Sequence, residues 1–114
     1  MNKDPKVFIN HILEAISDIE DFSKGITKEE LSINKMKQSA ILRQIEIIGE
    51  AVKNIPNDFR SKYSNVEWKK IAGTRDKMIH DYFGVDLKIV WDTVKEDLPK
   101  LKKQIESIIK DYDS

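Results

Sequence analysis

The sequence contains no cysteine, only four glycines and three prolines, and no excess of charge of either sign. Without cysteine, neither a disulfide framework nor a thiolate metal site can form, which suits a reducing cytoplasm. So few glycines and prolines disfavour a turn-rich β-protein. No run approaches the ~18 apolar residues that would suggest a membrane span, and the first residues lack the apolar core of a signal peptide. We therefore expect a cytoplasmic protein without a membrane segment.

The charges of the chain cancel, because 20 basic residues stand against 20 acidic ones. A protein that holds nucleic acid by its overall charge is usually basic. Any role with nucleic acid must therefore depend on a local patch or on a small, shaped site. The balance is also compatible with self-association, since chains without net charge associate readily. With 114 residues, we expect a single domain over residues 1–114.

The first half of the chain predicts two helices. The first begins with an N-cap at Asp4, followed by a proline, and ends at Gly25. After a loop over residues 25–34, the second occupies residues 35–56 and carries apolar residues on more than one face, which indicates burial on more than one side. Gly49 inside it costs about 1 kcal/mol relative to alanine. We interpret this glycine as the mark of a close crossing with another helix.

The second half predicts two more helices. The third starts near Val66 and is stopped by an interruption at residues 83–85. Asp86 is then a good N-cap for a long fourth helix. Pro99 should kink this helix without ending it, because the apolar pattern continues in register. Its seam consists of Leu87, Trp91, Val94, Leu98, Leu101, Ile105, Ile108 and Tyr112.

These blocks indicate an all-α fold, an antiparallel bundle of four to five helices, because short connections favour antiparallel neighbours. Trp68 and Trp91 are expected in its core. The apolar faces exceed what one small bundle can cover, so we expect a homodimer.

The segment AGTRDKMIHDYFG, residues 72–84, gathers side chains that can carry chemistry. The pKa of a histidine lies near neutral pH, so His80 can both take and give a proton. Arg75 holds a permanent charge and a donor fork that matches phosphate oxygens, and Asp76 could orient either group. An arginine and a histidine are a minimal kit for cleaving RNA without a metal. The only other histidine, His11, is not at metal-ligand spacing, so we expect no metal site.

The spacing of these residues also predicts a shared site. In an ideal helix, the five residues from Arg75 to His80 turn the chain through about 500°, which leaves the two side chains roughly 140° apart. They would not share a face. Two copies of the helix across a two-fold axis would let Arg75 of one protomer meet His80 of the partner subunit. We therefore expect an active cleft at a dimer interface.

The pattern of Arg75, four residues, His80, one residue and Tyr82 resembles the signature of HEPN-domain ribonucleases, specifically the HepT-like toxins. The flanking segments HILEAISDIEDFSKG and ILRQIEIIGEAVKNIP resemble the first two helices of that family. The resemblance implies a HEPN-like helical dimer that acts as a metal-independent RNA nuclease toxin with no cofactor. Its substrate would be RNA, with transfer RNA as the expectation at family level.

The resemblance also implies a partner, an MntA-like nucleotidyltransferase antitoxin. In the family, this antitoxin can silence the toxin by adding AMP to the motif tyrosine, which corresponds to Tyr82. One residue departs from the family pattern, because Asp76 stands where asparagine is frequent. The extra carboxylate lowers the local positive charge beside Arg75 and bears on phosphate binding.

Each of these residues also has a plainer interpretation. His80 could be a histidine at a helix end, Arg75 could pair with Asp76 or Asp81, and Tyr82 could pack its ring with the hydroxyl in water. On the second helix, the charged residues Arg43, Glu46 and Glu50 form either a buried or interfacial salt-bridge set or a support for the nuclease cleft.

Two other functions are compatible with the sequence. The chain could be a catalytically weak or inactive HEPN module that serves to engage a minimal nucleotidyltransferase, and Asp76 keeps this alternative open. It could also be a structural helical dimer, in which substitutions of Arg75, His80 and Tyr82 change only stability.

Overall fold

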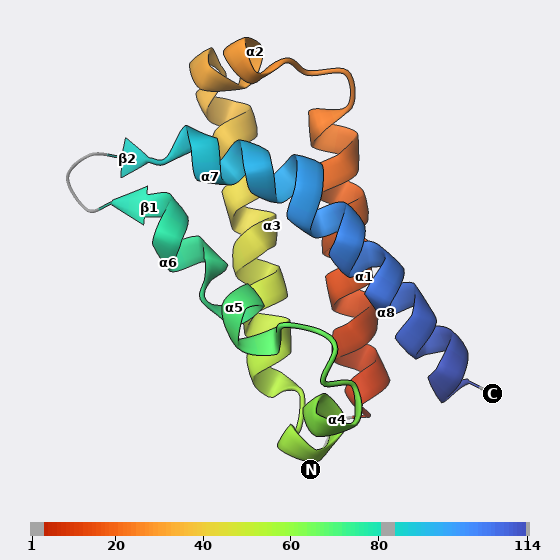
Figure 1. Ribbon diagram of the computed structural model, residues 1–114. Helices are drawn as coiled ribbons and strands as arrows, with labels where there is room; N and C mark the ends of the chain where they lie inside the picture. Colours follow the sequence, from red (N-terminus) through yellow and green to blue (C-terminus); the bar gives the residue numbers. More distant parts are fainter. Residues whose placement is uncertain (1–3, 81–83, 114) are drawn as a thin grey trace.

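A computed structural model describes residues 4–80 and 84–113 (Figure 1). None of the helices in these ranges is long and apolar enough to cross a lipid bilayer. The elements, in chain order, are α1 (Pro5–Ser23), α2 (Lys28–Ile33), α3 (Lys35–Asn54), α4 (Asn57–Lys62), α5 (Trp68–Ala72), α6 (Thr74–Met78), β1 (Ile79–His80), β2 (Gly84–Val85), α7 (Leu87–Asp92), the π-helical turn η1 (Thr93–Asp97) and α8 (Leu98–Tyr112).

The core lies between three long helical rods. α1 and α3 run antiparallel side by side, and α7, η1 and α8 form one rod that crosses them, while α5 and α6 flank α3 (Figure 1). Isoleucine dominates the buried side chains, as the apolar stripes predicted. The all-α prediction is confirmed, but the helical segments of the described ranges are more numerous than the four to five expected, because short helices occupy the connections. The largest side chains with almost no exposed surface are Ile9, Ile12, Ile16, Ile19, Leu31, Ile41, Val52, Ile55, Met78, Val90 and Ile105.

Three helix boundaries predicted from single residues are confirmed, at Asp4, Gly25 and Asp86. The Asp4 carboxylate accepts a hydrogen bond from the backbone N–H of Lys6 at 2.9 Å, and the Asp86 carboxylate accepts one from Ile89 at 3.2 Å. Gly25 follows α1 with a φ of 71°, a conformation that favours glycine. Local chemistry therefore sets where these helices begin and end.

Gly49 allows α3 and α5 to approach closely, as predicted. A Cβ atom at this position would lie 3.3 Å from the backbone oxygen of Ala72, the last residue of α5. Because α6 begins two residues later, this contact fixes the distance of α6 from α3. The crossing at Gly49 therefore positions the start of the Arg75–His80 segment.

The long rod at the C-terminal side passes Pro99 without ending. The backbone N–H of Leu98 donates to the carbonyl of Thr93, five residues back, and so closes a π-turn. Proline has no N–H, and its ring crowds the carbonyl four residues earlier, so a wider turn before Pro99 accommodates it. Beyond this turn, the predicted seam is confirmed at Leu98, Leu101, Ile105 and Ile108, whereas Tyr112 at its end is exposed, contrary to the prediction. Before it, Val90 is buried while Trp91 is only half-buried, with the Lys95 ammonium 4.8 Å from its ring centroid. Trp91 therefore packs at the edge of the core and not within it, whereas Trp68 is buried as expected.

Two predicted boundaries differ from the structure. The third predicted helix is divided at Gly73 into α5 and α6 and ends at Met78. β1 and β2 then pair antiparallel, with Ile79 opposite Val85 and His80 opposite Gly84. The Met78 carbonyl accepts from the backbone N–H of Asp86 at 2.6 Å, so the chain turns back on itself instead of continuing the helix. The predicted loop at residues 25–34 contains α2.

Candidate functional site

Arg75 lies on α6 and faces the middle of α3. Its Nε atom is 3.4 Å from Oε2 of Glu46, and its Nη1 atom is 3.8 Å from Oδ1 of the neighbouring Asp76. Nε is buried and forms no aligned hydrogen bond within the described residues, so the Glu46 contact is an ion pair. The side chain as a whole remains 43% exposed. One edge of the guanidinium is thus held against α3 while part of the side chain stays open to an anion.

The charged residues predicted on α3 do not act as one set. Glu46 lies between two arginines, with Oε1 3.8 Å from Nη1 of Arg43 and Oε2 near Arg75. Glu50 pairs instead with Lys53 at 3.8 Å. Arg43 is 68% exposed, so a salt-bridge set buried within this chain is ruled out. The structure therefore joins Glu46 to Arg75 and leaves Glu50 outside the site.

Asp76 is the most exposed member of the site. Its side chain is 83% accessible, and its only ion pair within the described residues is the one with Arg75. The predicted pair of Arg75 with Asp76 is present, and at this exposure it contributes little to stability. Its effect is electrostatic, because it places a negative charge beside the guanidinium.

The backbone of His80 lies in β1, outside the helix that carries Arg75. The separation of 140° calculated for one continuous helix therefore does not apply, because the helix ends at Met78. Asp81 and Tyr82, the predicted AMP acceptor, lie outside the described residues. The prediction of a site shared between protomers stays a prediction.

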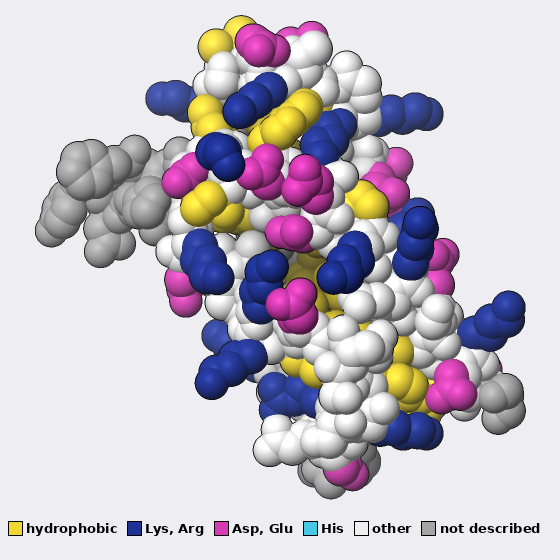
Figure 2. Space-filling view, viewed as in Figure 1, with side chains coloured by type: hydrophobic (Ala, Val, Ile, Leu, Met, Phe, Trp, Pro, Cys, Tyr) yellow, Lys and Arg dark blue, Asp and Glu magenta, His cyan; other side chains and the backbone are white. Residues whose placement is uncertain are grey.

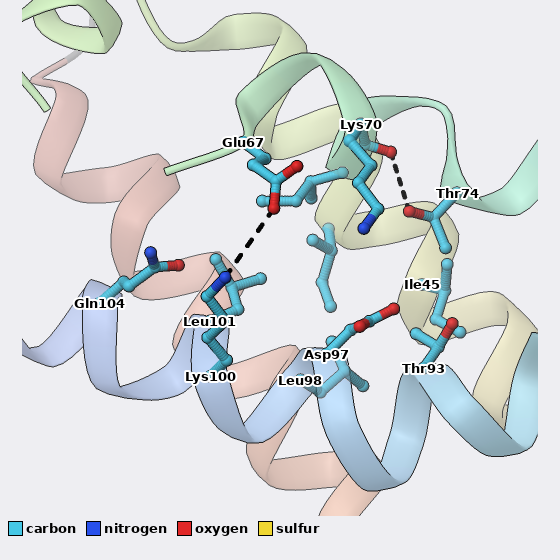
Figure 3. A pocket seen from close by; sticks show the side chains of 12 residues that line it. Ile45, Glu67, Lys70, Thr74, Thr93, Asp97, Leu98, Lys100, Leu101 and Gln104 are labelled. Carbon is cyan, nitrogen blue, oxygen red and sulfur yellow. Dashed lines mark hydrogen bonds and ion pairs between the residues drawn. The ribbon is translucent and has the colours of Figure 1, made fainter. Parts of the chain in front are cut away.

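Sequence reasoning missed a cleft whose lining reaches the residue before Arg75. It opens between α5 and the rod formed by η1 and α8, has a volume of about 100 Å³, and includes Thr74, the residue before Arg75 (Figure 3). Around the middle of the face shown in Figure 2, apolar side chains are visible among basic and acidic ones. No local motif marks the cleft, because its walls come from three separate helical segments. It is lined by Ile45, Ile48, Glu67, Lys70, Ile71, Thr74, Thr93, Asp97, Leu98, Lys100, Leu101 and Gln104.

Comparison with known proteins connects this arrangement to a family. The family model described as ribonuclease HepT-like matches residues 12–108, a range that includes α3, the Arg75–His80 segment and most of α8. The chain belongs to the HepT-like ribonuclease family. As a HepT-like protein with a HEPN-type helical fold, it carries the expected arginine on a short helix packed against α3.

The HepT-like chain is similar to several curated proteins. It is 49% identical over 113 residues to a Methanocaldococcus jannaschii protein named "Gamma-glutamylcyclotransferase and putative RNase". The aligned region covers 99% of this chain and 51% of that protein. The chain therefore spans about half the length of that relative. It is 49% identical over 111 residues to a "Putative RNase" of the same organism, covering 97% of this chain and 92% of that protein. It is 46% identical over 110 residues to the "Probable ribonuclease HepT" of Thermococcus cleftensis, covering 96% and 100%. No solved structure matches the chain.

Proposed function

We propose that this protein is a metal-independent RNA nuclease, the toxin of a HepT/MntA-type toxin–antitoxin system. The observation that carries the proposal is the half-exposed Arg75 guanidinium, held on α6 by Glu46 in a chain of the HepT-like ribonuclease family. An arginine held at one edge and open at the other suits a phosphodiester, because its planar donor fork matches two phosphate oxygens.

In the proposed reaction, the neutral imidazole of His80 takes the proton of a ribose 2′-hydroxyl. The 2′-oxygen then attacks the adjacent phosphorus, and Arg75 stabilises the negative charge that grows on the phosphoryl oxygens. The bond from phosphorus to the 5′-oxygen breaks, and the departing oxygen takes up a proton. The products are a 2′,3′-cyclic phosphate and a 5′-hydroxyl, so atoms and charge balance without an added co-reactant.

The proposed assembly is a homodimer in which Arg75 of one protomer acts with His80 of the partner subunit. The proposed antitoxin is an MntA-like nucleotidyltransferase that transfers AMP from ATP to the Tyr82 hydroxyl and releases pyrophosphate. Incubation with that enzyme and ATP should add the mass of AMP to the wild-type chain and leave Tyr82→Phe unmodified. An unmodified wild-type chain would count against this part of the proposal.

The nuclease proposal is tested with the two histidines of the chain. Purified protein should cleave RNA in the presence of EDTA, and His80→Ala should abolish the cleavage. His11→Ala is the matched control, because His11 is an exposed residue of α1 and should leave cleavage unchanged. Cleavage that requires a divalent metal, or that persists in His80→Ala, contradicts the mechanism.

The alternative is a HEPN module with weak or no cleavage that pairs with the nucleotidyltransferase. The contact between Asp76 and Arg75 at 3.8 Å favours this alternative, because the carboxylate competes with phosphate for the guanidinium. Expression without the antitoxin separates the two functions. Growth arrest that depends on His80 supports the nuclease, and normal growth supports the binding module.

A further inference from the structure

The cleft between α5 and the rod of η1 and α8 has an apolar floor suited to a flat ring. Its floor is built from aliphatic side chains of α3, α5 and α8, which are buried or half-buried. A flat, weakly polar group gains free energy by leaving water for such a surface. The side chains concerned are Ile45, Ile48, Ile71, Leu98 and Leu101.

The rim of the cleft offers hydrogen-bond acceptors. The amide nitrogen of Gln104 donates to the backbone oxygen of Asn65 at 3.2 Å, which turns the amide oxygen toward the cleft (Figure 3). The Asp97 carboxylate, carried by the π-turn, forms no hydrogen bond or ion pair with a described residue. Two acceptors above an apolar floor match a nucleobase, whose edge presents amino and imino N–H donors.

Lysines supply the positive charge that a nucleotide requires. The ammonium group of Lys70 points into the cleft (Figure 3) and forms no ion pair within the described ranges. Lys100 is held at the mouth, 3.9 Å from the Glu67 carboxylate. Lys70 also lines a wide surface groove together with Arg60 and Lys69. Lys70 therefore belongs to both the groove and the cleft, and the cleft also includes Thr74, the residue before Arg75.

From these contacts we propose that the cleft binds a nucleobase of single-stranded RNA, with Lys70 neutralising the attached phosphate. The assignment to RNA rests on the proposed nuclease function, which places the scissile phosphodiester at Arg75. A base in the cleft would fix which phosphodiester reaches Arg75 and so provide sequence preference. An aliphatic side chain from a second copy fits less well, because it would leave Asp97 and Gln104 without hydrogen-bond donors.

The first experiment measures binding without catalysis. The His80→Ala protein, labelled at the isoleucine methyl groups, is titrated with each of the four ribonucleoside monophosphates, with ribose 5-phosphate and with a short single-stranded RNA. The NMR signals of Ile45, Ile48 and Ile71 should shift with the nucleotides and the RNA, while that of Ile12, a buried residue of α1 that does not line the cleft, should not. Shifts of the same size with ribose 5-phosphate would indicate a phosphate site without base recognition and overturn the proposal.

Two other results of the titration also overturn it. Shifts with mononucleotides but none with the RNA would assign the cleft to a free nucleotide. Cleft signals that change when the protein is diluted, and not when ligand is added, would assign the cleft to a second copy of the chain.

The second experiment measures cleavage by the otherwise intact enzyme. Ile71→Phe fills the cleft with a larger side chain. Asp97→Asn, at an exposed position, removes the negative charge of this hydrogen-bond acceptor and keeps the size of the side chain. Both should raise KM for RNA by about tenfold, the size of a lost base contact, and leave kcat nearly unchanged. Lys70→Gln should raise KM as well, while Lys110→Gln, the same charge change at the far end of α8, should not.

The two experiments separate the cleft from the nuclease. If wild-type protein cleaves no RNA, the proposed function fails, and the mononucleotide titration still decides base binding. If cleavage is normal, Ile71→Phe and Asp97→Asn leave KM unchanged and no cleft methyl shifts, the nucleobase proposal fails alone.

Discussion

At the scale of single residues, the ion pair between Arg75 and Glu46 is the contact that ties the site to the bundle. Arg75 comes from a short helix and Glu46 from the middle of α3, so the pair fixes a side chain whose own element is only five residues long. Both side chains are about two-fifths exposed, and pairs of this kind contribute little to stability. We therefore propose a positioning role for Glu46, in which it keeps the guanidinium oriented for the phosphate of the proposed substrate.

The Glu46→Gln variant should separate orientation from stability. We expect the free energy of unfolding to change by less than about 1 kcal/mol. RNA cleavage should fall by about tenfold, because a displaced catalytic group lowers the rate even when it stays nearby. Glu50→Gln is the matched control, because it makes the same change one turn along α3, where the partner is Lys53. Equal losses in the two variants, measured by cleavage kinetics and denaturant unfolding, would contradict the assignment.

A second pair at the residue scale lies at the opposite end of the bundle. The Tyr63 hydroxyl donates to Oδ2 of Asp111 at 2.6 Å, and this hydrogen bond raises the pKa of Tyr63 to about 12. The neutral phenol is therefore favoured in the folded state. Its contribution to stability is fully present below the ordinary tyrosine pKa of 10.0 and disappears as the pH rises toward 12.

The Tyr63→Phe variant tests this pH dependence. The difference in free energy of unfolding between wild type and variant should be constant below about pH 10 and vanish between about pH 10 and 12. Other groups that titrate in this range contribute to the free energy of unfolding of both proteins, so their contributions largely cancel in the difference. One such group is Tyr112, whose pKa is raised by its hydrogen bond to Asp4. A difference that persists above pH 12, measured by urea unfolding at each pH, would show that the hydrogen bond is not its source.

At the scale of elements, the sequence predicted helices well where a cap or a long apolar pattern specifies them. It failed where a tertiary contact decides. The third helix was expected to continue through His80, but the Met78 carbonyl bonds to Asp86, eight residues ahead, and a pairing at this distance leaves no local signature. By contrast, α2 could have been predicted, because Thr27 and Glu30 have the spacing of a capping box. In the structure, the Thr27 hydroxyl accepts a hydrogen bond from the backbone N–H of Glu30 at 3.1 Å.

The cleft between α5 and the rod of η1 and α8 was beyond sequence reasoning for a related reason. Its floor combines residues from α3, α5 and α8, and the distances between those helices follow from packing. Arg75 and His80 could be proposed because they are close in sequence and match a family pattern, and Asp76 could be proposed because it is the neighbour of Arg75. The contact of Arg75 with Glu46 joins residues far apart in sequence, so only the general suggestion that α3 supports the site was within reach.

The crossing of α3 and α5 yields a prediction at this scale. A Cβ at Gly49 would press on the Ala72 backbone oxygen at 3.3 Å, and the branched side chain of valine would force the helices apart. Gly49→Val should lower the free energy of unfolding by about 1–3 kcal/mol. It should also reduce RNA cleavage, because it would move α6 and with it Arg75. Lys53→Val, at an exposed position of the same helix, is the control for the change in helix propensity. Equal stability of the two variants in thermal unfolding would show that the crossing is not tight.

At the scale of the whole molecule, the position of His80 leaves the shared site as a question of assembly. The chain leaves the helix between Arg75 and His80, so the two residues are no longer related by helical geometry. A dimer with a two-fold axis would bring two Arg75–His80 segments together and form two equivalent sites. The relevant observable is therefore the activity of mixed dimers.

Arg75→Ala and His80→Ala should each be inactive, and mixing the two variants should restore cleavage. If Arg75 works with His80 of the partner subunit, a mixed dimer contains one complete site. Random pairing makes half of the dimers mixed, so the activity should reach about a quarter of the wild-type value. Sedimentation should give twice the chain mass of 13.3 kDa, and subunit exchange is checked with differently labelled copies. If exchange occurs without recovery of cleavage, the two groups act within one chain, because a mixed dimer would then lack a complete site.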